Sequence, residues 1–149
     1  MLTERALALK HAARAGRNDK PLHGKHFGLI CQRPDSCDAE LFRRAASQLG
    51  ARVACIAPNV GGPLDAIDVA NTSRLLSRLY DAVECQGLPT ELVVQLRSAT
   101  SIPVFDCIAW QSPLDAQRAA AIDAQTGDTD GRFFLLQARL IGVFSCDGA

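Results

Sequence analysis

Phe27-Gly-Leu-Ile-Cys31 and Arg52-Val-Ala-Cys-Ile-Ala57 are short apolar runs bounded by turn residues, and each is typical of a buried strand. Between the two runs, apolar residues recur at helical spacing from Leu41 to Leu49. Gly50 follows at the place where a glycine commonly ends a helix. The strand–helix–strand order is the unit from which parallel sheets are built.

The same alternation continues on both sides of this unit. Helices are expected at about 3–15, 72–79, 92–99, 113–124 and 133–144, and further short strands at 82–83 and 102–105. The helix at 72–79 is expected to bury a stripe of Leu75, Leu76 and Leu79. The chain is therefore expected to form one α/β domain over residues 1–149, in three layers. It would hold a four-stranded parallel sheet flanked by helices and closed by a C-terminal helix.

Composition and charge exclude several classes of protein. Sixteen basic residues balance sixteen acidic ones, which argues against electrostatic binding of nucleic acid or of a membrane surface. No run approaches the roughly 20 apolar residues of a membrane span, and no secretory signal is apparent. The six cysteines include no Cys-x-x-Cys pair, so a zinc ribbon is excluded. We expect a cytoplasmic protein with buried reduced thiols, no cofactor and no bound metal.

Several segments resemble motifs of one enzyme family. They are Leu22-His-Gly-Lys25, Cys31-Gln-Arg-Pro34, Leu49-Gly50, Asn71-Thr-Ser-Arg-Leu-Leu-Ser-Arg-Leu-Tyr-Asp81 and Ile102-Pro-Val104. In this order they are similar to the carbamoyl-phosphate-binding, N-terminal domain of the aspartate/ornithine carbamoyltransferases. The resemblance extends over residues 22–108. It implies that the ligand site lies at the carboxyl ends of the strands, as is usual in parallel sheets.

The C-terminal segment carries a second resemblance. Gly131-Arg-Phe-Phe-Leu-Leu-Gln-Ala-Arg-Leu140 is similar to the family's final helix, and residues 131–145 are expected to form it. In full-length members that helix returns after a second domain, which binds the amino-acid substrate. Here only about 125–130 connects it to the preceding helix, which implies that the second domain has been excised. The alternative is an unrelated apolar helix that closes the sheet.

The phosphate-binding motifs of the family are replaced in this chain. The family's Ser-Thr-Arg-Thr-Arg corresponds to Asp35-Ser-Cys-Asp-Ala39, and an arginine after the third strand corresponds to Gln86. The His-Pro-x-Gln motif falls on Ser112-Pro-Leu-Asp115, and the Glu-Ser pair of a loop that reaches a neighbouring subunit falls on Ile67-Asp68. The degenerate phosphate-site positions are Asp35, Ser36, Cys37, Asp38, Ala39, Gln86 and Asp106.

These losses imply a catalytically degenerate domain without carbamoyl transfer, because arginine supplies the paired, charge-assisted hydrogen bonds that hold a phosphate. We expect a binding or oligomerisation module, such as a homo-oligomer (for example a trimer), with an unidentified small-molecule or protein partner. The alternative is half of an amino-acid carbamoyltransferase that needs a second chain for activity.

Three cysteines lie near the carboxyl ends of three expected strands. Cys37, Cys85 and Cys107 form a candidate thiol pocket in which at least two sulfurs would lie within ~5 Å. The alternative is that these cysteines are small fillers where long arginines were lost.

Overall fold

The structure is a computed structural model that describes residues 2–17, 19–57, 66–108 and 112–145, with only the backbone described at 66–68 and 145. The side chains of Ile67 and Asp68 therefore lie outside the described part, as does Cys146. Among the described residues, no helix is long and apolar enough to cross a membrane.

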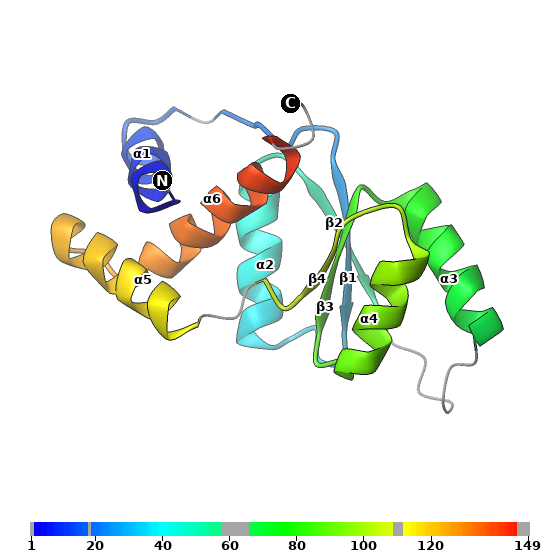
Figure 1. Cartoon of the computed structure of the whole chain (residues 1–149). Helices are drawn as coiled ribbons and strands as arrows, with labels where there is room; N and C mark the ends of the chain where they lie inside the picture. The colour runs from blue at the N-terminus through cyan, green and yellow to red at the C-terminus, as the bar shows by residue number, and fades with distance from the viewer. Residues whose placement is uncertain (1, 18, 58–65, 109–111, 146–149) are drawn as a thin grey trace.

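In the described residues, four parallel strands form one sheet, as the sequence predicted (Figure 1). The strands are β1 (His26–Cys31), β2 (Arg52–Ile56), β3 (Ala82–Gln86) and β4 (Val104–Asp106). Their spatial order is β2-β1-β3-β4. β1 and β3 are therefore neighbours in the middle of the sheet, and their carboxyl ends lie side by side.

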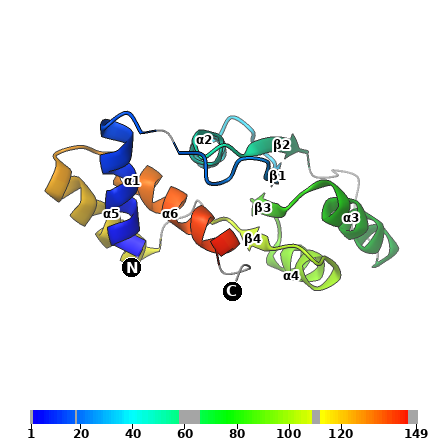
Figure 2. The ribbon, with the colours of Figure 1, turned by 90° about the horizontal axis from the view of Figure 1, so that it is seen from above.

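Six helices accompany the sheet in the described part of the chain. They are α1 (Leu2–Arg14), α2 (Cys37–Gln48), α3 (Ala66–Leu79), α4 (Thr90–Ala99), α5 (Pro113–Thr126) and α6 (Gly131–Ser145). α3 and α4 cover one face of the sheet, and α2 and α6 cover the other (Figure 2). The three predicted layers are confirmed, and α1 and α5 pack against α6 on its side away from the sheet.

The C-terminal helix lies in the larger of two core clusters. Leu135, Ala138 and Leu140 are almost fully buried there, together with Ala6 of α1 and Phe27 of β1. A helix that is apolar on most sides must be covered on most sides. α1, α2 and α5 contact α6 and supply that cover. The expected C-terminal helix that closes the domain is confirmed.

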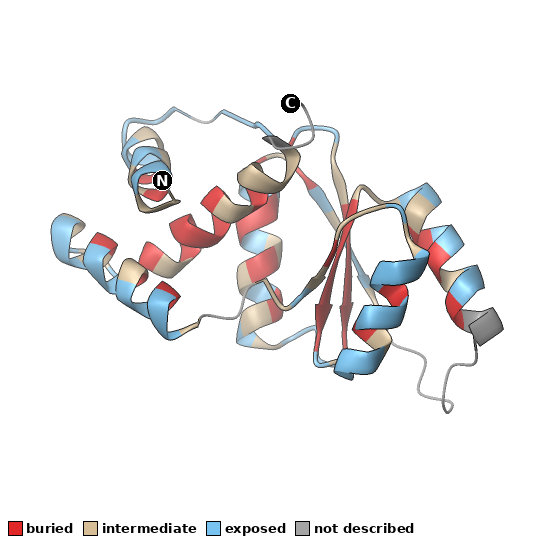
Figure 3. Ribbon diagram, in the orientation of Figure 1, coloured by how far each residue is buried: buried red, intermediate tan, exposed pale blue. Residues whose placement is uncertain are grey.

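Two expectations about burial are wrong. β2 lies at the edge of the sheet, and Ala54 and Cys55 are exposed rather than buried (Figure 3). In α3 only Leu76 of the expected stripe is buried, while Leu75 is 58% and Leu79 is 61% exposed. Leu76 shares its buried face with Val69, one heptad earlier, and that spacing places Leu75 and Leu79 beside the buried stripe.

Candidate functional site

A cavity of about 290 Å³ opens at the carboxyl ends of β1 and β3, beside the first turn of α2. Its lining comprises Cys31, Gln32, Arg33, Ser36, Asp38, Gln86, Gly87 and Cys107. This is the edge at which open parallel sheets bind ligands, and it is the place where the sequence placed the degenerate phosphate site.

The first turn of α2 already uses one of its amide groups within the protein. Ser36 is the N-cap residue, and its Oγ accepts a hydrogen bond of 3.1 Å from the amide of Ala39. Asp38 and Glu40 add carboxylates to this turn. Acidic side chains stabilise a helix start because they interact with its partial positive charge. They also offset that charge, which would otherwise attract an anion.

Gln86 stands at the end of β3, where the resemblance implies an arginine. Its Nε2 donates to the carbonyl oxygen of Asp38 and to Oε2 of Glu84, both at 3.3 Å. Glu84 is fully buried and also accepts a hydrogen bond of 2.9 Å from the amide of Ile108. The donor atoms of Gln86 are therefore turned toward acceptors of the protein itself.

One ion pair joins the cavity to the C-terminal helix. Nη2 of Arg132 in α6 lies 2.6 Å from Oδ1 of Asp38. Arg33 is the single arginine of the described lining, and it is exposed. Because Asp38 lines the same cavity and the carboxylate of Glu84 lies behind Gln86, the site lacks the excess of positive charge that a phosphate dianion requires.

The structure brings only part of the predicted site together. Ser36, Asp38, Gln86 and Cys107 line the cavity. Asp35, Cys37 and Asp106 are exposed and do not line it, and Ala39 is buried and contributes its amide to the cap. The segment Ser112–Asp115 forms a capping box at the start of α5 and also lies outside the lining.

The three cysteines of the predicted thiol pocket lie in different surroundings. Cys85 is fully buried in the core cluster under α3 and α4, whereas Cys107 lines the cavity on the other side of the sheet. Alternation along β3 explains the difference, because Glu84 and Gln86 face the cavity side and Cys85 points the opposite way. Cys37 is exposed.

Two residues of the site were missed by the sequence analysis. Glu84 lies within a strand that was expected to end at Val83, and a carboxylate inside an apolar run was the available signal. Arg132 was noted only as part of a helix motif, and its pairing with Asp38 bridges segments that are far apart in the sequence. Such a contact becomes visible only once α6 is placed against α2.

The similar proteins described below are all carbamoyltransferases. No family model matches the chain. The ornithine carbamoyltransferase of Haemophilus influenzae (strain PittGG) is 33% identical over 98 residues, which is 66% of this chain and 29% of that protein. A catabolic ornithine carbamoyltransferase of Pseudomonas putida shows the same identity and coverage. The chain thus spans less than a third of the length of these curated relatives.

Solved structures agree with this fold. The ornithine carbamoyltransferase of Pyrococcus furiosus superposes with a TM-score of 0.66 at 23% identity, over 85% of this chain and 41% of that one. A putative aspartate carbamoyltransferase of Leishmania major Friedlin gives a TM-score of 0.63 at 22% identity, over 85% and 40%.

Proposed function

We propose that this chain, a single-domain relative of the ornithine and aspartate carbamoyltransferases, is a catalytically degenerate member that serves as a binding or oligomerisation module. The observation that carries the proposal is the Asp38–Arg132 ion pair at the ligand edge of the sheet. The carboxylate of Asp38 is paired with Arg132 at the place where the resemblance implies a bound phosphate.

The loss of the phosphate-binding arginines is large enough in free energy to abolish useful binding of carbamoyl phosphate. A hydrogen bond to a charged group contributes about 1.5–3 kcal/mol. Loss of three arginines, at the positions of Cys37, Ala39 and Gln86, would remove on the order of 5–9 kcal/mol if the contributions were independent. Such contributions are seldom additive, yet half of that sum already weakens binding by roughly a hundredfold or more.

The connection between α5 and α6 supports the loss of transfer chemistry. α5 ends at Thr126 and α6 begins at Gly131, so the segment between them is a short turn. Lys10 of α1 holds this turn, since its Nζ lies 3.1 Å from Asp128 and also pairs with Asp130. The resemblance implies a second, amino-acid-binding domain before the final helix, and this turn leaves no room for one.

The direct test is an activity and binding assay on the purified chain. We expect no citrulline and no carbamoyl-aspartate above a heat-killed control when carbamoyl phosphate and the amino acid are supplied. We also expect no rise in melting temperature with carbamoyl phosphate or inorganic phosphate at millimolar concentration. Product formation that survives removal of contaminating host transferase would overturn the proposal.

The alternative is that the chain is half of an amino-acid carbamoyltransferase, and one measurement distinguishes it from the proposal. Product would then appear only when a second chain carrying an amino-acid-binding domain is added. The oligomeric part of the proposal is tested separately by light scattering coupled to size exclusion. A trimer would show three times the 16.0 kDa mass of the chain, whereas a concentration-independent monomer would restrict the proposal to a binding role.

A further inference from the structure

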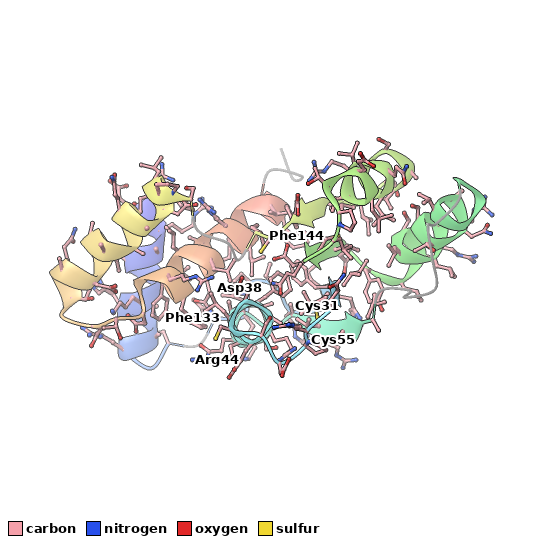
Figure 4. The ribbon with its side chains drawn as sticks, turned by 90° about the horizontal axis from the view of Figure 1, so that it is seen from below. Cys31, Asp38, Arg44, Cys55, Phe133 and Phe144 are labelled. Carbon is pink, nitrogen blue, oxygen red and sulfur yellow. The ribbon has the colours of Figure 1, made fainter. Side chains whose placement is uncertain are left out.

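Two thiols meet on the α2 side of the sheet, away from the predicted cysteine cluster. Cys31 ends β1 and Cys55 lies in the neighbouring edge strand β2. Figure 4 shows the two residues next to one another. Cys31 is 2% exposed and Cys55 is exposed, so the pair has one buried member and one that solvent reaches.

The strand register shows why the two sulfurs face the same way. Cys55 lies opposite Leu29, and Cys31 lies two residues beyond Leu29 on the same face of β1. The two cysteines are therefore diagonal neighbours across a parallel pair of strands. With strands ~4.8 Å apart and a rise of ~3.3 Å per residue, their Cα atoms are separated by roughly 8 Å.

That separation disfavours a disulfide and favours a bridging atom. Disulfides require Cα atoms within about 6.8 Å and a sulfur–sulfur bond of about 2.05 Å. A cation held in line between two thiolates instead keeps the sulfurs about two metal–sulfur bonds apart, with each bond near 2.3 Å. Two thiols that face the same way on neighbouring strands reach that spacing by rotation of their side chains.

A third residue supplies the charge that such a site needs. Nη1 of Arg43 in α2 donates to Sγ of Cys55 at 3.3 Å. A monovalent cation between two thiolates forms a complex with one net negative charge, and the guanidinium offsets it. Burial raises the pKa of the Cys31 thiol, the adjacent Cys55 adds to the rise, and Arg43 lowers it.

The geometry points to a two-coordinate site for a soft monovalent cation, of which Cu(I) is the type, formed by Cys31 and Cys55 with Arg43 as the neighbouring charge. Binding replaces two thiol protons by one cation, so that Cu⁺ and two thiols give a bis-thiolate cuprate and two protons. No group of three or more His, Cys, Asp or Glu in the described chain could hold a metal. The site offers two thiol ligands, and a soft cation of low coordination number is the class of ion that such a pair binds.

The test is an anaerobic titration of the reduced, full chain with Cu(I) in competition with a chromophoric chelator. We expect one cation per chain and release of two protons. Cys55→Ser, which changes an exposed side chain, should weaken binding by more than about a hundredfold, beyond the range of outer-shell changes. Arg43→Gln should weaken it by about tenfold and keep the stoichiometry.

Matched cysteine variants make the assignment specific. Cys37→Ser changes another exposed thiol, and Cys107→Ser changes the thiol that shares the cavity lining with Cys31. Both should bind Cu(I) as the parent chain does. The proposal is overturned if Cys55→Ser binds as tightly as the parent, or if either control variant loses the site. Quantitative formation of a Cys31–Cys55 disulfide under mild oxidation would also overturn it.

Discussion

Arg132 of α6 donates from Nη2 to Oδ1 of Asp38 at 2.6 Å and so connects the C-terminal helix to the first turn of α2. Both side chains are more than a third exposed, so the pair itself adds little to the free energy of unfolding. Its effect is local, because it fixes a carboxylate at a helix start that lines the cavity.

The first prediction concerns that carboxylate. Asp38→Asn removes one negative charge from the cavity and the partner of Arg132, so the affinity for inorganic phosphate should rise by about tenfold, or 1.4 kcal/mol. Isothermal titration calorimetry measures the change. Asp35→Asn is the control, because Asp35 is exposed and does not line the cavity. Equal affinities in both variants and the parent chain would contradict the prediction.

A second prediction addresses the close approach of α5 and α6. A Cβ atom at Gly131 would clash with the backbone oxygen of Ala119 and meet the carboxylate of Asp123, which accepts the Gly131 amide at 2.8 Å. Gly131→Ala should therefore lower the free energy of unfolding by about 1–3 kcal/mol in urea denaturation.

Gly142→Ala in the same helix is the matched control. The nearest atom to a Cβ there is Nη1 of Arg5 at 3.5 Å, an ordinary contact with the end of a flexible side chain. Replacement of a helical glycine by alanine should raise the free energy of unfolding by up to about 1 kcal/mol. A destabilisation at Gly142 equal to that at Gly131 would refute the packing argument.

The sequence predicted the layers and the sheet because apolar runs coincide with buried residues along most strands. β1 is a continuous apolar run with a turn signal at each end, and such a run predicts a buried strand. The same reasoning failed for β2, since an apolar run cannot show whether a strand lies in the middle or at the edge of a sheet. Strand order is set by tertiary packing.

The site was less accessible to sequence reasoning because its contacts join distant segments. The position of Gln86 followed from the resemblance, but its bond to the Asp38 carbonyl did not. The three-cysteine hypothesis rested on strand ends and did not include the alternation that places Cys85 in the core cluster under α3 and α4. The Cys31–Cys55 pair depends on the register of β1 against β2, which no local pattern encodes.

A third prediction separates the thiols by reactivity. Burial, together with the carboxylates of Glu84 and Asp106, raises the pKa of Cys85 to about 12. Since the thiolate is the nucleophile, Cys85 should stay unmodified by iodoacetamide in the folded protein at mildly alkaline pH. The exposed thiol of Cys37 should be modified under the same conditions. Peptide mass spectrometry, with a denatured sample as the reference for full labelling, would detect unexpected labelling of Cys85.

The last prediction concerns the pH dependence of stability at the start of α5. Asp115 is almost fully buried and pairs with Arg139 of α6, with Arg118 at 3.3 Å. Burial acts to raise the pKa of its carboxyl, but hydrogen bonds from Arg139 and Ser112 outweigh burial, and the pKa lies below the ordinary value of 3.8. The unfolded chain therefore binds this proton at a higher pH than the folded chain does.

The sign of the effect follows from that difference. The contribution of Asp115 is fully present above pH 3.8 and is lost as the pH falls through the lower, folded-state pKa. Asp115→Asn should cost about 1.5–3 kcal/mol at neutral pH, and the gap between parent and variant should shrink once the pH drops below 3.8. Urea denaturation across this range measures the gap. Asp106→Asn, at an exposed site, is the control for loss of a carboxylate. A gap for Asp115→Asn that widens in acid would contradict the ion-pair argument.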